Sequence, residues 1–188
     1  MRIVLTLVGV VLLGAAISAQ QPTFEHKVLA TSKTSTMEKE LNEAAEAGYR
    51  FQHVMGGESA IGGKEVVVIM SRVQPATSRY SYRLLATAKT STMQKELQAA
   101  ADAGFLYRGQ TVFSSTFGGD EVVVILERDK ESADTKFDYR LLATTKTSTL
   151  EKELLGAGAA GYEVVGMTVG NTAIGGKELV AITRRMRP

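Results

Sequence analysis

One string of residues is written three times, with few changes, along this chain of 188 residues. It runs from Thr31 to Leu41, again from Thr87 to Leu97, and a third time from Thr144 to Leu154. Self-similarity at a regular spacing means that the fold is assembled from one repeated supersecondary unit. Each repeat extends on both sides of the string, and we predict the repeat boundaries 24–73, 80–129 and 137–186.

Residues 1–19 have the pattern of a secretory signal peptide. Arg2 precedes an apolar run from Ile3 to Ile17, and Ser18-Ala19 gives a small-residue exit. The run is shorter than the roughly 20 apolar residues of a transmembrane span, so we expect cleavage after Ala19. The mature protein is then expected in the periplasm or outside the cell, without a stable membrane anchor. An uncleaved anchor is the alternative for the same run.

The composition limits the possible partners and compartments. The chain has no cysteine, so it forms no disulfides and has no lipid-bearing cysteine at the cleavage site. Lys and Arg number 22 against 20 Asp and Glu, and losing Arg2 with the leader lowers the net charge from +2 to +1. Nonspecific nucleic-acid binding needs clustered basic surface, so no nucleic-acid partner is expected.

Each repeat opens with a predicted strand, because aromatic and apolar side chains alternate at period two on one face. The alternating residues are Phe24, His26, Val28 and Ala30, then Tyr80, Tyr82, Leu84 and Ala86, then Phe137, Tyr139, Leu141 and Ala143. His26 takes the position of two tyrosines. We therefore expect His26 to pack on a core face.

A helix follows each first strand. Its start is predicted from a Ser-x-x-Glu/Gln capping box, in which the serine oxygen accepts a backbone hydrogen bond and the glutamate reaches back. The three pairs are Ser35 with Glu38, Ser91 with Gln94, and Ser148 with Glu151. Helical spacing predicts a buried stripe, made of Met37, Leu41, Ala44 and Ala45 and matched by Met93, Leu97 and Ala100.

Glycines end each helix and also interrupt the third one. Gly48, Gly104 and Gly161 are placed for a left-handed C-cap. Gly156 and Gly158 each cost about 1 kcal/mol relative to alanine within a helix. We therefore expect the third helix to be the loosest, or Gly158 to lie tight against the sheet.

Two more strands complete each repeat. The second follows the helix, and a Gly-Gly pair (62–63, 118–119 and 175–176) turns the chain into the third. The third is the most apolar and reads Val-Val-Val-Ile at 66–69. A strand that is apolar on both faces belongs at the centre of a sheet covered on both sides. The predicted strand order is therefore 1-3-2, with antiparallel pairing.

A single unit of this kind buries only a thin core, so the units are expected to form one body. We expect Leu29, Leu85 and Leu142 to point to the sheet face that the helix leaves open. The predicted fold class is α+β, with three tandem β-α-β-β repeats packed with approximate internal threefold symmetry. The sheets either pack face to face or continue one another.

The repeats resemble a family of small bacterial domains of unknown function, family 4177. The residues that carry the resemblance are Tyr139-Arg-Leu-Leu, Leu150-x-x-x-Leu154 and Gly161-Tyr-Glu-Val-Val165. Tyrosine or phenylalanine stands here where that family usually has tryptophan. The resemblance implies the β-α-β-β fold and no activity.

The Thr/Ser-rich entry into the helix is also similar to dodecins, which are β-α-β-β proteins that store flavin. Dodecins stack the flavin on tryptophan, and this chain has none. No cofactor is therefore expected.

The helix starts are the candidate binding sites. A cation, hydroxyl groups and free amides at a helix N-terminus form a plausible anion or phosphate site. The candidate residues are Lys33, Thr34, Ser35, Lys89, Thr90, Ser91, Lys146, Thr147 and Ser148. The alternative is that these segments only cap their helices, which explains the serine but not the repeated lysine.

Other polar residues give no catalytic or metal site. Two histidines, His26 and His53, without cysteine make no metal-ligand set. Glu65, Glu121 and Glu178 recur after the Gly-Gly turns; they either meet in the packed repeats or are solvated charges at a strand start. No catalytic constellation is recognisable, so we expect no enzyme.

The expected function is that of an exported, noncatalytic binding or interaction protein. The alternative is a small-ligand or anion carrier that uses the repeated Lys-Thr-Ser-Thr helix starts.

Overall fold

The computed structural model describes residues 22–58, 63–115, 119–132, 135–171 and 176–187. The predicted leader lies outside these residues, and each predicted Gly-Gly turn lies partly outside them.

Each of the three units has the element order strand, helix, strand, strand. Unit 1 contains β1 (Phe24–Thr31), α1 (Thr34–Glu46), β2 (Arg50–Glu58) and β3 (Lys64–Val73). Unit 2 contains β4 (Tyr80–Thr87), α2 (Thr90–Asp102), β5 (Leu106–Ser115) and β6 (Gly119–Asp129), and unit 3 contains β7 (Phe137–Thr144), α3 (Thr147–Ala159), β8 (Glu163–Asn171) and β9 (Lys177–Met186).

Each unit forms its own three-stranded antiparallel sheet. The strand orders are β1-β3-β2, β4-β6-β5 and β7-β9-β8. The pairing register repeats as well: Val28 is opposite Ile69 in unit 1, and Leu84 is opposite Ile125 in unit 2. The predicted fold class of three β-α-β-β repeats with strand order 1-3-2 is confirmed.

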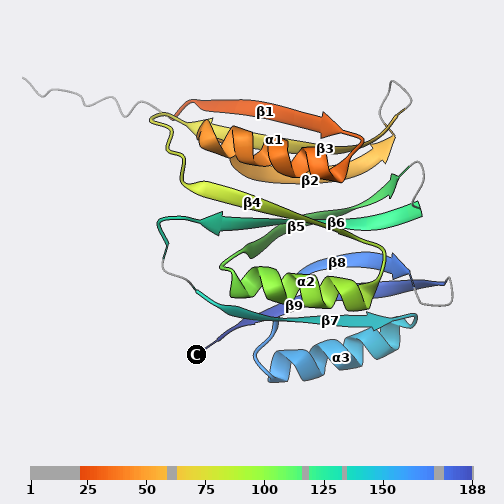
Figure 1. The fold of residues 1–188 in the computed structure, drawn as a ribbon. Coiled ribbons are helices and arrows are strands. Elements are labelled where there is room, and N and C mark those ends of the chain that lie inside the picture. Colours follow the sequence, from red (N-terminus) through yellow and green to blue (C-terminus); the bar gives the residue numbers. More distant parts are fainter. Residues whose placement is uncertain (1–21, 59–62, 116–118, 133–134, 172–175, 188) are drawn as a thin grey trace, which may run out of the picture.

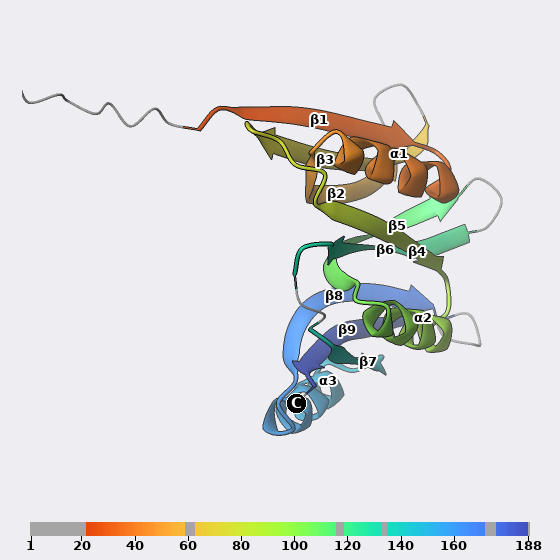
Figure 2. The same cartoon turned by 60° about the vertical axis from the view of Figure 1, so that its left-hand side comes forward.

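The three units follow one another in a single stack (Figure 1). The sheets pack face to face, with β2 against β5 and β5 against β8. Each helix also lies along the first strand of the next unit, α1 beside β4 and α2 beside β7 (Figure 2). Units 1 and 2 therefore pack against each other in the same way as units 2 and 3.

Every unit presents two different faces to its neighbours. We call the sheet surface that carries the alternating residues of the first strand the strand face. We call the opposite surface, made by the helix and the other side of the sheet, the helix face. In the stack, the helix face of one unit meets the strand face of the next.

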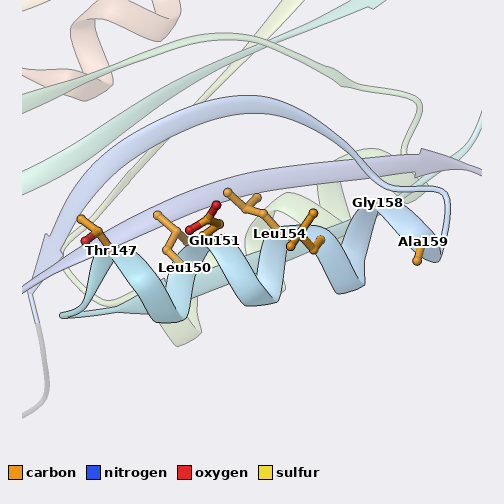
Figure 3. Close-up of a pocket in the computed structure, with 7 residues that line it drawn as sticks. Thr147, Leu150, Glu151, Leu154, Gly158 and Ala159 are labelled. Atoms are coloured by element: carbon orange, nitrogen blue, oxygen red, sulfur yellow. The ribbon is translucent and has the colours of Figure 1, made fainter.

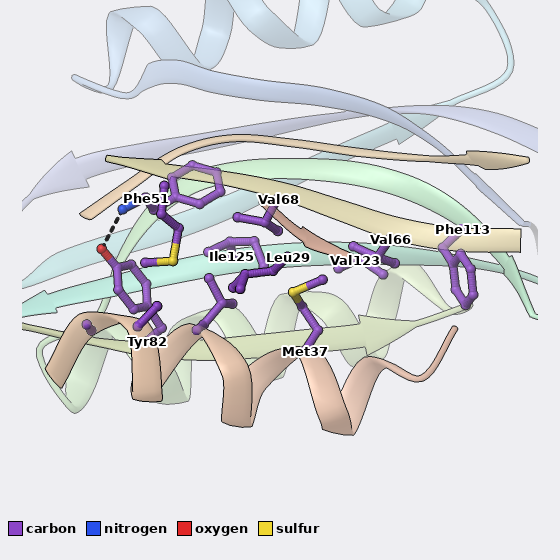
Figure 4. Packing of buried hydrophobic residues seen from close by; sticks show 13 residues of the cluster. Leu29, Met37, Phe51, Val66, Val68, Tyr82, Phe113, Val123 and Ile125 are labelled. Atoms are coloured by element: carbon purple, nitrogen blue, oxygen red, sulfur yellow. Dashed lines mark hydrogen bonds between the residues drawn. The ribbon is translucent and has the colours of Figure 1, made fainter. Parts of the chain in front are cut away.

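The first core is built from both kinds of face (Figure 4). The helix face of unit 1 contributes side chains from α1 and its sheet, and the strand face of unit 2 contributes the others. The buried members include Leu29, Met37, Leu41, Phe51, Val68 and Met70 from unit 1 and Tyr82, Phe113, Val123 and Ile125 from unit 2. The second core repeats this pattern between units 2 and 3.

The helix starts differ from the prediction, while the helix ends confirm it. The N-caps are Lys33, Lys89 and Lys146, without a side-chain capping bond, so the predicted capping box is wrong. Instead, the hydroxyl of Thr31 accepts a hydrogen bond from Lys33 N–H at 3.2 Å, and Thr87 and Thr144 do the same for their lysines. The predicted glycine C-caps are confirmed, since φ is +84° at Gly48 and +81° at Gly104 and at Gly161.

Several predictions about burial are wrong. His26 is exposed rather than packed in a core, and Ile69 in the third strand of unit 1 is 40% exposed. Leu29 lies in the core with α1, so it does not point away from the helix. His26 and Ile69 lie on the strand face of unit 1, which no preceding unit covers in the part of the chain that the structure describes. At the other end, a Cβ at Gly158 would meet nothing within 4 Å, so this glycine does not lie tight against the sheet.

Candidate functional site

The predicted helix-start sites do not converge. The three starts lie on the same side of the stack, one in each unit (Figure 1). Lys33, Lys89 and Lys146 are all exposed. At the start of α2, the hydroxyl of Thr90 donates to Glu178 of unit 3 at 2.5 Å, so a carboxylate of the chain itself occupies this position. The anion site stays a prediction, and this contact gives it no support.

Of the three recurring glutamates, Glu178 accepts this hydrogen bond across a junction between units. The three glutamates belong to three different sheets, and the turns beside them lie partly outside the described residues. Glu178 of unit 3 therefore links its unit to unit 2 rather than meeting the other two recurring glutamates.

Side chains of each helix bind the free edge of the next sheet. In α1, Glu38 accepts a hydrogen bond from the Leu84 N–H at 2.8 Å. The amide of Asn42 donates to Tyr82 O and accepts from Tyr82 N–H, each at 2.9 Å. These bonds satisfy backbone groups on the open edge of β4, which would otherwise be free to pair with another strand.

The same arrangement recurs one unit further on. In α2, Gln94 accepts from Leu141 N–H and donates to Tyr139 O, both at 2.8 Å. Gln98 accepts from Tyr139 N–H at 3.0 Å and donates to Phe137 O at 3.2 Å. The edge of β7 is therefore held by two side chains one helical turn apart, as the edge of β4 is.

A tyrosine of each inner strand face anchors the preceding unit. The Tyr82 hydroxyl accepts from Phe51 N–H at 2.8 Å (Figure 4), and the Tyr139 hydroxyl accepts from Tyr107 N–H at 2.8 Å. Burial raises the pKa of Tyr82 well above its usual range, and the neighbouring charge of Glu127 adds to the shift. Burial also raises the pKa of Tyr139. Both hydroxyls therefore stay protonated and neutral at ordinary pH.

Glycine on each inner strand face makes room for an aromatic side chain. A Cβ at Gly109 would lie 3.0 Å from the ring of Phe51, and one at Gly166 would lie 2.4 Å from the Tyr107 hydroxyl. The matching residue of unit 1 is His53, which is exposed. Close approach of two sheets thus requires a glycine at this position when the facing residue is aromatic.

One buried carboxylate distinguishes the first junction. Glu127, only 5% exposed, is bound by Arg50 at 2.9 Å, by the Tyr82 hydroxyl at 2.8 Å and by Arg108 at 3.4 Å. The hydrogen bonds that Arg50 donates to Glu127 raise the pKa of Arg50. With these partners the carboxylate is fully paired, which suits a structural role better than a catalytic one.

The two ends of the stack leave apolar surface uncovered. Most of the large apolar side chains that are exposed in the described chain lie on the strand face of unit 1 or the helix face of unit 3. On the strand face of unit 1 they are Phe24, Val28, Met55, Ile69 and Val73, and on the helix face of unit 3 they are Leu155, Val164, Met167 and Val169. Clustered apolar surface of this kind marks interaction sites.

The helix face of unit 3 contains a groove along α3 (Figure 3). Leu154 and Gly158 line it and are partly or fully exposed, whereas their counterparts Leu97 and Ala101 in α2 are completely buried. Glu151 also lines the groove, and it corresponds to Glu38 and Gln94. The groove is therefore lined by the same kinds of side chain that α1 and α2 use to bind the edge strands β4 and β7 of the next units.

Among the residues that the structure describes, no group of three or more histidine, aspartate or glutamate side chains is placed to hold a metal ion. No helix in this part of the chain is long and apolar enough to cross a membrane.

Comparison of the chain with protein-family models, with curated proteins and with solved structures gives no match.

Sequence reasoning missed the helix residues that bind the next unit. The sequence pattern predicts Glu38, Gln94 and Glu151 as capping residues, and no predicted motif includes Asn42 or Gln98. The available signal was that position 38 and its counterparts are always Glu or Gln. A capping box explains such a residue equally well, so the sequence alone did not separate the two roles.

Proposed function

We propose that this chain is an exported, noncatalytic interaction protein that binds protein partners through the two end faces of its stack. These are the strand face of unit 1 and the helix face of unit 3. Export is proposed from the leader pattern of residues 1–19.

One observation carries the proposal. Several of the apolar side chains exposed on the end faces occupy positions that are buried or partly buried where one unit meets another; Ile69, for example, corresponds to Ile125 and Ile182, which are completely buried. Val28 is 64% exposed, while its counterpart Leu84 packs against the first core. A protein partner on either end would remove from water the type of surface that the inner junctions already bury.

The test is site-specific photo-crosslinking of the exported protein in cells. A photo-reactive amino acid is placed at Val28, at Leu155 or at the matched control Lys95, an exposed residue on α2 of the middle unit. We expect protein adducts at Val28 and Leu155 and not at Lys95. Adducts at all three positions, or at none, contradict the proposal.

A further inference from the structure

We propose that the partner is a second copy of this chain, docked head to tail. The helix face of unit 3 in one copy binds the strand face of unit 1 in the next copy. This inference rests on the proposed function of the end faces and names their partner. It follows from the inner junctions, which use the same two kinds of face twice within one chain.

The edge of β1 has the same need for a cover as the edges of β4 and β7. β1 is an edge strand whose pairing with β3 repeats that of β4 with β6. The N–H of Val28 therefore takes the place of the Leu84 and Leu141 N–H groups, which donate to Glu38 and Gln94. Glu151 on the helix face of unit 3 offers a carboxylate at the matching helix position.

The anchoring hydrogen bond also has a counterpart at the ends. Val164 corresponds to Phe51 and Tyr107, whose N–H groups donate to tyrosine hydroxyls on the facing strand. His26 stands in the position of those tyrosines. A neutral imidazole has one ring nitrogen that accepts a hydrogen bond, so His26 supplies the acceptor that the Val164 N–H requires.

The end faces differ from the inner faces in a way that keeps their shapes complementary. At the inner junctions, an aromatic side chain, Phe51 or Tyr107, faces a glycine. At the ends, the smaller Val164 would face His53. The larger side chain on one face is offset by a smaller one on the other, which preserves the close approach of the sheets.

Leu155 replaces the amides of Asn42 and Gln98. It is 71% exposed, and the matching helix positions lie over the first half of the next unit's first strand, where Gln98 reaches Phe137 O. Phe24, which is 57% exposed, takes the position of Phe137 on the strand face of unit 1. An apolar contact between Leu155 and Phe24 thus replaces the amide bonds.

A head-to-tail contact does not close on itself unless the rotation between copies forms a ring. Each added copy presents the same two faces again. The mature chain is therefore expected to grow in mass as its concentration rises.

Sedimentation equilibrium of the full mature chain tests this inference with two charge substitutions. Val28→Glu blocks the strand face, and Leu155→Glu blocks the helix face; both positions are exposed, so neither change disturbs a core. Each variant should self-associate at least about tenfold more weakly, because burying an unpaired carboxylate is unfavourable. Lys95→Glu also places a new carboxylate on an exposed position of the middle unit and should associate like the parent.

The decisive sample is an equimolar mixture of the two variants. Each retains the face that the other has lost, so the mixture should form dimers and stop there. A parent chain that stays monomeric up to millimolar concentration overturns the inference, as does a mixture that stays monomeric. Parent-like association of either variant alone also overturns it, since that result indicates contact between two identical faces.

These outcomes distinguish a failure of the second-copy inference from a failure of the proposed function. If the parent stays monomeric while crosslinks at Val28 and Leu155 capture another protein, the inference of a second copy fails and the interaction function stands. If neither position gives an adduct, the proposed function fails as well.

Discussion

Helices α2 and α3 start with the same Thr-Ser-Thr sequence and have the same length, but they differ in what surrounds them. α2 lies on its own sheet and along the edge of β7, so Met93, Leu97, Ala100 and Ala101 are all buried. α3 lies on its own sheet alone, and only Leu150 and Ala157 are buried. The apolar stripe of each helix therefore serves two neighbours, its own sheet and the next unit.

Comparing the two helices separates burial by the helix's own sheet from burial by the next unit. The apolar stripe in the sequence does not distinguish these two contributions. The residues buried in both helices are held by the helix's own sheet. The residues buried only in α2 need the next unit as well. The first two predictions below change a position in α2 together with its counterpart in α3, and the other two change residues of one helix only.

The largest effect is expected for the central leucines. Leu97→Ala should reduce the free energy of unfolding by about 3 kcal/mol, because it leaves a cavity at a fully buried site. Leu154→Ala should cost about 1 kcal/mol or less, since that side chain is partly exposed and the site can fill with water. Urea denaturation of both variants measures the difference. Equal losses would show that α3 is covered in solution.

The amide that binds the edge of β7 gives the second effect. Gln98→Leu should destabilise the chain by about 1–2 kcal/mol, because the Tyr139 N–H and the Phe137 carbonyl lose their partners. The reverse change, Leu155→Gln, should alter the stability of dilute monomer by less than about 0.5 kcal/mol, because it is an exposed site. A harmless Gln98→Leu would mean that the helix amides do not hold the edge.

Glycine in α3 gives a smaller effect of opposite sign. Gly158→Ala should stabilise the chain by about 0.5–1 kcal/mol, since a Cβ there meets no atom within 4 Å and alanine favours the helix. Gly156→Ala, equally open, is the matched control and should give the same gain. A loss of stability at Gly158 alone would indicate that something packs on this helix face.

The smallest effect concerns acid sensitivity at the end of α2. The hydrogen bond from Arg187 lowers the pKa of Asp102, with Gln98 contributing, whereas α3 has Ala159 at that position. A carboxyl with a lowered pKa stabilises the folded chain fully above its unfolded pKa of about 4. The stabilisation is lost as the pH falls through the lower folded value.

Melting temperature measured from neutral pH down to about pH 3 checks this prediction. Asp102→Asn should melt lower than the parent at neutral pH, and the two should approach each other as the solution becomes acidic. A constant difference across that range would show that the Asp102 charge does not contribute.

Much of the unit could be predicted from sequence because its signals are local. The period-two strands, the helical stripe and the glycine C-caps depend on residues close together in the chain, and all three repeats agree. The strand order followed from the apolar third strand, since a strand that is buried on both sides belongs at the centre. These features are set within a single unit.

The errors fall where a unit meets another unit or meets none. His26 has the pattern of a core residue, and its counterparts Tyr82 and Tyr139 are buried, yet it is exposed because no unit of the described residues packs on the strand face of unit 1. Glu38 has the pattern of a capping residue but binds the edge of the next sheet. Local patterns do not record which neighbour covers a face, so the candidate interaction faces became visible only in the assembled structure.

The central claim is that the helix of one unit protects the strand edge of the next. Amide hydrogen exchange of dilute mature protein tests it at three matched N–H groups, those of Val28, Leu84 and Leu141. We predict slow exchange at Leu84 and Leu141, whose N–H groups donate to Glu38 and Gln94 at 2.8 Å, and fast exchange at Val28, which has no preceding helix in the described chain. Equal protection of all three amides, or fast exchange at Leu84 and Leu141, would contradict the claim.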